Sequence, residues 1–420
     1  MVLIVGSTST GTGIRYDLAA ADNMFVLNNA NIVSTDNAAI RGLGGNHTVT
    51  VSGHVYGEGR DGISLGNTLA TDSNNRVVVN AGGYVGGDDD AISLTGSDTH
   101  VENYGSLSGN YGINIYGPSG SNSTIINAGT ISAKYGAIYS GGNANITLLN
   151  TGSINGSGSG SAYTSNGSGV DTITNRGLMT GAITLGMGND VYDGRLGSAL
   201  GQLSGGEGND RFRLGAGEEK VDGGTESDSV DYRSSTGVTL ALDGSLANSG
   251  MASGDSFVNV ESFFGSATGA DVLVGDALAN VFYGGGGNDV LSGNAGNDAL
   301  VGGLGTDRLT GGLGNDAFVF ASPAHGADVI NDFTNLTGNN DIIRISAAGF
   351  GAGLVAGPLN AAYFRSQTTN VAGDSNDRFI FRSTDKTLWF DANGTGAGGL
   401  TLLADLQASA TLTAADIILI

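Results

Sequence analysis

Short runs of alternating apolar and polar residues fill the first 185 positions of the chain. The runs are rich in Val, Ile and Thr and are bounded by Gly, Asn or Ser, and they lack the i, i+3, i+4 spacing of an amphipathic helix. Asparagines recur among them at steps of 23, 24, 23 and 25 residues: Asn80, Asn103, Asn127, Asn150 and Asn175. Each lies two places after an apolar residue, namely Val78, Val101, Ile125, Leu148 or Ile173. A period of this length predicts a solenoid of stacked strands.

One period of about 24 residues can hold two or three short strands, as one coil of a parallel β-helix requires. We predict a right-handed parallel β-helix of about seven coils over residues 1–185, with weaker copies of the repeat beginning near Asn28 and Ser52. Stacking would bring the asparagines into one internal ladder, in which each amide bonds to the next coil. This organisation resembles the coils of parallel β-helix surface proteins and polysaccharide-active enzymes.

A second, shorter period begins further along the chain. From Gly284 the sequence reads GGGGNDVLS, GNAGNDALV, GGLGTDRLT and GGLGNDAFV, and the two preceding blocks, SATGADVLV and GDALANVFY, fit the same frame. The eighth position of the frame is always Leu or Phe. The sixth position holds Asp271, Asn280, Asp289, Asp298, Asp307 and Asp316.

Each part of the nonapeptide has a physical role. Glycine permits tight loops with φ > 0 and exposes carbonyl groups, the aspartate supplies a hard oxygen ligand, and the apolar residue points into a thin core. Two nonapeptides make one coil, so we expect Asp289 to lie above Asp307 and Asp298 above Asp316. Two like charges at this separation require a cation between them. Oxygen ligands without His or Cys favour calcium over zinc or copper.

These nonapeptides resemble the GGxGxDxUx repeats of the RTX, or hemolysin-type calcium-binding, family. The resemblance implies an RTX β-roll over residues 266–320 that binds several calcium ions. It assigns the metal sites to the sixth-position aspartates and to the loop glycines Gly285, Gly287, Gly296, Gly303, Gly305, Gly312 and Gly314.

A more degenerate block precedes the strict one, in GMGNDVYDG, SGGEGNDRFRL and DGGTESDSVDY. Asp210, Glu219 and Asp228 are nine residues apart there, and Asp190 precedes them with a slipped spacing. The resemblance implies a first RTX roll over residues 186–232, with Asp190, Asp210 and Asp228 as calcium ligands. Glu219 replaces the sixth-position aspartate and Glu226 the fourth-position glycine, which weakens the match of this roll. Residues 233–265 are similar to the β segment that joins such blocks.

Composition and charge narrow the class of protein. Glycine supplies 75 of 420 residues, but Pro is only 3 and no G-X-Y period occurs, which excludes a collagen-like chain. With 39% hydrophobic and 14% charged residues, the chain does not fit the disordered class. The net charge of −23 opposes binding to nucleic acid or to an anionic membrane, so cations are the expected partners. The absence of Cys excludes disulfides and thiolate metal sites.

Residues 321–420 change to a different pattern of strands that ends in DIILI. This segment is similar to the C-terminal module of RTX exoproteins, and the resemblance implies a β cap with a signal for a type I secretion apparatus. The final residues equally suit the last strand of a capping sheet. The opening run Met1–Val5 is too short for a signal peptide, and no segment reaches the about 20 apolar residues of a membrane span. We expect a secreted protein that is extracellular or associated with a cell surface.

The predicted β-helix offers few residues for catalysis, and the HExxH and GxSxG motifs are absent. Asp61, Asp89 and Asp90 are the candidates for an acid and a base, because Asp61 and Asp90 each lie two residues before the Ile of an Ile-Ser-Leu strand. The segment GGDDDAIS is similar to the paired aspartates of polygalacturonase-like glycosidases. However, the Arg-x-Lys of those enzymes and the DPH motif of RTX-bearing mannuronan epimerases are missing, which favours a solvated turn or an additional cation site at Asp88–Asp90 over catalysis. The histidines of this segment do not match a catalytic motif of those enzymes, because His47, His54 and His100 lie in ordinary turn or strand contexts.

Two functions are compatible with these patterns. The first is a secreted calcium-binding RTX protein that folds when calcium binds and displays its β-helix to a cell surface or an extracellular matrix. The alternative is an extracellular polysaccharide lyase, hydrolase or epimerase that uses the RTX repeats as a secretion module. The missing catalytic motifs favour the first. Residues that could stack on the sugar rings of a polysaccharide partner are Tyr84, Tyr104, Tyr111, Tyr116, Tyr135 and Tyr139.

Overall fold

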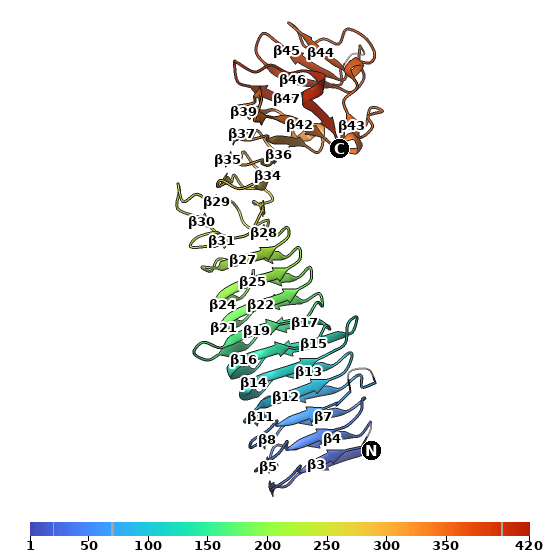
Figure 1. Ribbon diagram of the computed structural model, residues 1–420, viewed down its shortest axis with the longest axis vertical. Helices are drawn as coiled ribbons and strands as arrows, with labels where there is room; N and C mark the ends of the chain where they lie inside the picture. The colour runs from blue at the N-terminus through green and yellow to red at the C-terminus, as the bar shows by residue number, and fades with distance from the viewer. Residues whose placement is uncertain (20, 69–70, 396–397) are drawn as a thin grey trace. The chain divides into compact units, whose positions relative to one another are not determined.

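The computed structural model describes residues 1–19, 21–68, 71–395 and 398–420. The described chain is almost entirely β, with long parallel sheets, which confirms the predicted parallel β-helix and β-roll class. It divides into two compact units (Figure 1). The first comprises Met1–Ser229 with Asp255–Val260, and the second comprises Val230–Gly254 with Glu261–Ile420.

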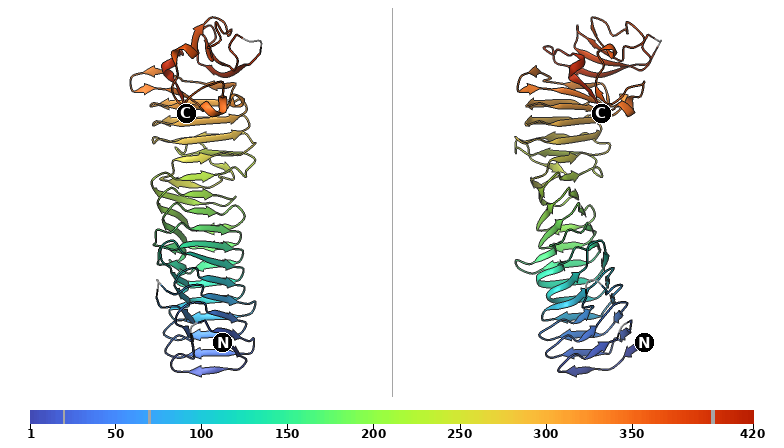
Figure 2. Two further views of the ribbon diagram at one scale, coloured as in Figure 1. Left: turned by 90° about the vertical axis from the view of Figure 1, so that its right-hand side faces the viewer. Right: turned by 45° about the vertical axis from the view of Figure 1, so that its right-hand side comes forward.

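The first unit is a stack of coils in which each coil gives one strand to one parallel sheet and two strands, or one long strand, to another (Figure 2). In the described residues, the coils through β22 number eight. They are β1 (Val2–Val5), β2 (Ser9–Gly11), β3 (Tyr16–Leu18); β4 (Asn23–Val26), β5 (Asn31–Ser34), β6 (Ile40–Gly42); β7 (Thr48–Val51), β8 (His54–Gly57), β9 (Ile63–Leu65); β10 (Arg76–Val79), β11 (Tyr84–Gly87), β12 (Asp90–Thr95); β13 (His100–Asn103), β14 (Ser106–Tyr116); β15 (Asn122–Asn127), β16 (Thr130–Ser140); β17 (Asn145–Asn150), β18 (Ser153–Gly156), β19 (Ser161–Ser165); and β20 (Thr172–Asn175), β21 (Leu178–Thr180), β22 (Ala182–Met187). The stack continues with β23 (Val191–Asp193), β24 (Ser198–Leu200), β25 (Gln202–Glu207), β26 (Arg211–Arg213), β27 (Lys220–Thr225) and β31 (Ser256–Val258). The sequence repeat predicted about seven coils and missed the first one, because no asparagine follows β1.

Parallel pairing in register makes every coil point equivalent side chains in the same direction. One inward column consists of Val49, Val77, Val101, Ile125, Leu148 and Ile173, each at most 1% exposed. Burial of one such side chain contributes about 1.5–3 kcal/mol relative to leaving it in water. The β-branched alternation of the sequence therefore builds a continuous thin core along this unit.

The predicted asparagine ladder is present in four successive coils. Nδ2 of Asn103, Asn127 and Asn150 donates to Oδ1 of the asparagine in the next coil at 2.8, 2.8 and 2.9 Å, and the last acceptor is Asn175. All four side chains are at most 1% exposed. Each amide thus satisfies a polar group in the core with the equivalent residue of its neighbour.

The prediction that Asn80 belongs to this ladder is wrong. The register pairs Val79 with Asn103, so Asn80 lies one residue beyond the column. Its Nδ2 bonds instead to Oγ of Ser52 at 2.8 Å, and its side chain is partly exposed. Val78, the apolar residue two places before Asn80, is partly exposed as well, while Val77 and Val79 are buried.

The second unit contains a β-roll with coils of 18 residues. Val281 pairs with Ala299, and Val290 pairs with Arg308, so two nonapeptides make one coil, as predicted. The eighth-position side chains fill the core between the two sheets, and Leu291, Leu300 and Phe318 are fully buried. One sheet contains β32 (Ser262–Phe264), β34 (Val281–Gly286), β36 (Ala299–Leu304), β38 (Ala317–Phe320) and β42 (Ile342–Ile345), and the other β29 (Val238–Ala241), β33 (Val272–Val274), β35 (Val290–Ala295), β37 (Arg308–Leu313) and β39 (Asp328–Ile330).

The C-terminal residues of the second unit form a cap on its own two sheets. The cap packs the rings of Phe350, Phe379 and Phe390 with centroids 4.9–6.4 Å apart. Its elements are α1 (Ala347–Phe350), β43 (Gly357–Pro358), β44 (Phe364–Gln367), β45 (Phe379–Arg382), β46 (Thr387–Asp391), β47 (Leu400–Leu406) and β48 (Ile417–Leu419). β48 pairs with β42 and β43, so the last apolar residues are a strand of the capping sheet. No helix within the described ranges is long and apolar enough to cross a membrane.

The ladder gives a test of the coil stack. We expect Asn127→Ala to lower the free energy of unfolding by about 2–4 kcal/mol, because it leaves buried polar atoms of Asn103 and Asn150 without their partner. Asn122→Ala, at the exposed end of the same strand, is the matched control and should cost less than about 0.5 kcal/mol. Urea denaturation measures both values. Equal losses in the two variants would show that the ladder does not stabilise the stack.

Candidate metal centre

The sixth-position residues of the nonapeptides lie in two columns within the second unit. Asp271, Asp289 and Asp307 follow one another along one column, one coil apart. The second column consists of Asn280, Asp298 and Asp316. Each follows a glycine loop that ends a strand, so the loops of neighbouring coils stack as the strands do. All six side chains are at most 2% exposed.

One oxygen of each aspartate has a backbone partner in the neighbouring coil. Oδ1 of Asp289 accepts from the amide of Asp271 at 2.8 Å, and Oδ1 of Asp307 accepts from that of Asp289 at the same distance. The second column repeats the bond, from Asn280 to Asp298 at 2.7 Å and from Asp298 to Asp316 at 2.9 Å. These bonds fix the carboxyl groups in one orientation.

The other oxygen of these aspartates is buried without a hydrogen-bond partner. This holds for Oδ2 of Asp289, Asp298, Asp307 and Asp316. Each Oδ2 lies against the first glycine of its own nonapeptide, where a Cβ would overlap the carboxyl group, as at Gly284 beside Asp289. An unpaired buried carboxylate oxygen costs several kcal/mol unless a positive group neutralises it. The geometry therefore fits a cation held at each loop.

The loop glycines supply the remaining oxygens. The seven glycines predicted to belong to the site have φ between 102° and 138°. A Cβ at Gly303 would overlap the carbonyl oxygen of Gly285 in the previous coil, and one at Gly305 would overlap that of Gly287. Carbonyl oxygens of successive loops thus lie above one another. Asn294 replaces glycine at the second position of its nonapeptide and adopts a positive φ of 70°.

The ligand set is rich in backbone oxygens. In the described residues no group of three or more His, Asp or Glu side chains converges as a metal site. A cation at these loops would therefore combine one or two carboxylates with glycine carbonyl groups. Calcium accepts six to eight oxygen ligands of this kind in flexible geometry, whereas zinc prefers four ligands with nitrogen or sulfur.

Burial raises the pKa of the aspartates of the strict repeats. It raises the pKa of Asp289 to about 7 and that of Asp298 to about 6, and the neighbouring carboxylates Asp307 and Asp316 add to the effect. The pKa values of Asp271, Asp307 and Asp316 are raised mainly by burial as well. Without a cation, these groups hold protons at acidic pH; a cation would favour the ionised form.

The degenerate block in the first unit repeats this geometry in part. The amide of Asp190 donates to Oδ1 of Asp210 at 2.8 Å, and that of Asp210 donates to Asp228 at 2.7 Å. Oδ2 of Asp190 and of Asp210 is buried without a hydrogen-bond partner. Burial raises the pKa of Asp190 to about 8 and that of Asp210 to about 7.

Glu226 is the departure from the repeat in this block. It stands in place of the fourth-position glycine and adopts φ 72°, a conformation that favours glycine. Its Oε2 accepts from the amide of Gly208 at 2.6 Å, so the carboxylate is anchored to the loop of the previous coil. On the other side of the coil, Glu219 donates its amide to Oδ1 of Asp255 at 2.8 Å.

The columns extend beyond the residues that the sequence period identified. Asp328 accepts from the amide of Asp307 at 2.9 Å, and Asp341 accepts from that of Asp316 at 3.1 Å. In the first unit, the amide of Asp171 donates to Oδ1 of Asp190 at 2.6 Å. All three are at most 1% exposed. Each of these aspartates is followed two residues later by a buried Ile. This Asp-x-Ile pattern could have identified them in the sequence if the search had allowed steps longer than nine residues.

Asp171 ends the first column in a different way. Its Oδ2 accepts from the hydroxyl of the buried Tyr163 at 2.6 Å, and its Oδ1 accepts from the amide of Ile146 at 2.9 Å. The hydroxyl of Tyr163 is therefore a neutral donor to Oδ2 of Asp171, whereas Oδ2 of Asp190 has no hydrogen-bond donor. This carboxyl group has both oxygens satisfied by the protein itself.

The candidate catalytic acids lie in neighbouring coils of the first unit. The register aligns Ile63 with Ile92, and Asp61 and Asp90 therefore occupy equivalent positions. Asp90 is 5% exposed, and burial, followed by the charge of Asp61, raises its pKa to about 7. Burial also raises the pKa of Asp61. Asp89 is exposed.

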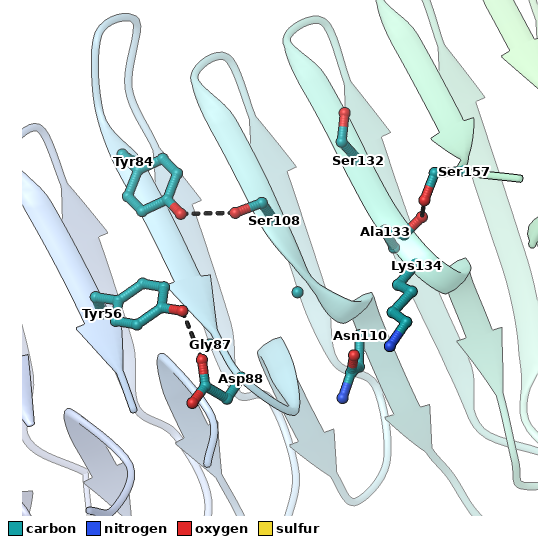
Figure 3. Close-up of a pocket in the computed structure, with 11 residues that line it drawn as sticks. Tyr56, Tyr84, Gly87, Asp88, Ser108, Asn110, Ser132, Ala133, Lys134 and Ser157 are labelled. Atoms are coloured by element: carbon teal, nitrogen blue, oxygen red, sulfur yellow. Dashed lines mark hydrogen bonds between the residues drawn. The ribbon is translucent and has the colours of Figure 1, made fainter. Parts of the chain in front are cut away.

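A groove of about 400 Å³ lies on the outer face of β8, β11, β14, β16 and the loops that follow (Figure 3). The hydroxyl of Tyr84 lies 2.6 Å from Oγ of Ser108, and Tyr56 donates to Oδ1 of Asp88 at 2.6 Å. Lys134 lines the same groove. The lining residues, all in the described part of the chain, do not include the three candidate catalytic acids.

The histidines and tyrosines have mostly structural contacts. Both ring nitrogens of the buried His47 bond to backbone carbonyl groups, His54 stacks on Tyr84 with centroids 4.6 Å apart, and Nε2 of His100 lies 2.8 Å from Glu102. Of the tyrosines expected to stack on sugars, Tyr104 bonds Glu102. Tyr111, Tyr116, Tyr135 and Tyr139 form a cluster on β14 and β16 with neighbouring centroids 5.6–6.2 Å apart.

Comparison with known proteins locates the columns within a recognised repeat. The RTX calcium-binding nonapeptide repeat matches the chain in four copies, at residues 202–230, 267–300 and 283–318. Among solved structures, the AlgE6R3 subunit from the Azotobacter vinelandii mannuronan C5-epimerase is 31% identical, over 36% of this chain and 79% of that one, with a TM-score of 0.25. A comparison with curated proteins gives no match. The chain carries the calcium-binding nonapeptide repeats of the RTX family.

Proposed function

We propose that this protein is an extracellular RTX protein whose β-rolls fold when calcium binds. The observation that carries the proposal is the row of buried aspartate oxygens without partners, at Asp289, Asp298, Asp307 and Asp316. A coil of only 18 residues buries little apolar surface to offset these groups. The cation therefore supplies a large part of the stability of the roll.

Calcium binding to the native state alone stabilises it by RT ln(1 + [L]/Kd). Sites with Kd of about 10⁻⁴ to 10⁻³ M fill in extracellular medium and stay empty in the cytosol. We infer that the chain is exported unfolded by a type I secretion apparatus and folds outside the cell. The C-terminal segment 321–420 is the proposed region for the export signal, and the first unit is the proposed surface for a matrix or cell-surface partner.

The role of calcium can be tested by titration. We expect the β signal in circular dichroism and the thermal stability to rise with millimolar calcium. The double variant Asp289→Ala, Asp307→Ala should lose most of the rise, because two loops of one column lose their carboxylates. Asp374→Ala, an exposed acid of the same unit, is the control and should respond as the unmodified chain does. A calcium response equal in all three proteins would refute the assignment of these loops.

The raised pKa values predict how pH acts on the calcium-free protein. A carboxyl group with a pKa of about 4 in the unfolded chain and about 7 when folded binds more protons in the folded state between these values. The stability of the EDTA-treated protein should therefore fall as pH rises from about 5 to about 7.5.

Calcium reverses this order, because it binds the ionised carboxylates. In millimolar calcium we expect the melting temperature to be higher at about pH 7.5 than at about pH 5. Differential scanning calorimetry at the two pH values, with EDTA and with calcium, measures the effect. The same pH trend in both conditions would contradict calcium binding by the buried aspartates.

A second candidate function is polysaccharide binding, and the groove on the first unit favours it. Tyr84 on β11 and Lys134 on β16 offer an aromatic ring and a cation along the same groove (Figure 3). This combination suits a sugar polymer that carries carboxylates. The structural neighbour named for a mannuronan epimerase motivates uronate polymers as the panel to test.

Loss of the ring should weaken such binding. We expect Tyr84→Ala to reduce affinity for a bound uronate polymer by about tenfold, equivalent to about 1.4 kcal/mol. Tyr104→Ala, an exposed tyrosine outside the groove, should leave affinity unchanged. Isothermal calorimetry in calcium measures both. Unchanged affinity in Tyr84→Ala would show that the groove is not the binding surface.

A further inference from the structure

Asp61 and Asp90 meet at the corner of two neighbouring coils in the first unit. Asp61 precedes β9 and Asp90 begins β12, and these strands pair in register. The backbone amide of Gly62, the residue after Asp61, donates to the carbonyl oxygen of Asp90 at 2.9 Å. This bond holds the two acidic residues next to each other in neighbouring coils.

Asp90 is the unusual member of the pair, because it is 95% buried with one oxygen unsatisfied. Its Oδ2 accepts from Nδ2 of Asn114 at 2.9 Å, while its Oδ1 has no hydrogen-bond partner. Oδ1 of Asn114 is buried without a partner as well. Oδ1 and Oδ2 of Asp90 share one carboxyl group, and Oδ1 and Nδ2 of Asn114 share one amide group. Both partnerless oxygens therefore lie close to the 2.9 Å bond between the two side chains.

Two carboxyl groups, of Asp61 and Asp90, and the partnerless amide oxygen of Asn114 therefore gather at this corner. Two like charges in a shared, desolvated position require a proton or a cation between them. The basic neighbour of Asp61 is Arg60, whose side chain is exposed at the surface.

We propose that Asp61, Asp90 and Asn114 hold a divalent cation, calcium, at a lateral site of the β-helix. Carboxylate and amide oxygens without nitrogen or sulfur ligands suit calcium, and Ser64 and Ser93, which pair on β9 and β12, bring further oxygens to the same strands. The site differs from the nonapeptide loops, because its ligands are side chains from three coils: one just before β9, one at the start of β12 and one on β14. Burial, followed by the charge of Asp61, raises the pKa of Asp90, and a cation beside it would favour the ionised form.

The site fixes three coils to one another on the face that carries the tyrosine cluster. Tyr111 pairs with Asp90 in the register, and its ring lies 5.6 Å from that of Tyr139. A cation bound here would order this part of the outer surface. A lanthanide in the same position would also be close enough to tyrosine rings to be excited by them.

Two substitutions test the proposal in the full chain. Asp90→Asn keeps the size of the side chain and removes its charge, and Asp61→Asn does the same at a half-buried position. We expect native mass spectrometry at saturating calcium to count one ion fewer in each variant, and tyrosine-sensitised terbium emission to fall. Asp88→Asn is the control, because both oxygens of Asp88 already have partners in Tyr56 and Gly59.

The alternative is a proton shared by the two carboxyl groups. In that case Asp90→Asn binds as many calcium ions as the unmodified chain and changes thermal stability by the same amount in EDTA and in calcium, which would overturn the proposal. The double variant Asp289→Ala, Asp307→Ala separates the two kinds of site: it should lose ions from the loops and retain the terbium signal that Asp61→Asn removes. A protein that binds no calcium at its loops can therefore still confirm or refute the lateral site.

Discussion

Buried carboxylate oxygens that no protein donor reaches are the constraint around which this structure is built. Parallel coils of 18 residues stack identical loops, and each stack places an aspartate above an aspartate, as with Asp289 and Asp307. One oxygen is tied to the backbone of the neighbouring coil, and the other faces the glycine loop without a partner. The repeats are recognised as calcium-binding, and the cation gives these oxygens the positive charge that the chain itself does not provide.

Two kinds of polar column run along the stacked coils, with different chemistry. In the β-helix, the ladder carries asparagine two residues after the inward apolar residue, and its amide is both a donor and an acceptor, so Asn103, Asn127 and Asn150 satisfy one another without help. An ionised aspartate has acceptors only, and a column of them cannot close on itself. The column of aspartates in the first unit ends at Tyr163, whose hydroxyl completes the carboxyl group of Asp171 with a neutral donor.

The strict periods made much of this fold predictable from the sequence. The nine-residue frame fixed the coil length, the buried Leu and Phe residues and the stacking of Asp289 on Asp307, because each position of the frame has one physical role. Prediction failed where the spacing changed: Asn80 lies one residue outside the ladder, and Asp328 and Asp341 continue the columns after longer steps. The partnerless oxygens of Asp90 and Asn114 could not be predicted, since they depend on side-chain directions across three coils.

Amide hydrogen exchange followed by mass spectrometry tests the central claim most directly, because it reports each unit of the same molecule separately. The account predicts that peptides from residues 267–318 are protected in millimolar calcium and exchange rapidly in EDTA. Peptides that contain the asparagine ladder, residues 101–150, should remain protected in both conditions. Equal protection of residues 267–318 with and without calcium would contradict the account, because the roll would then be stable with its aspartate oxygens unpaired.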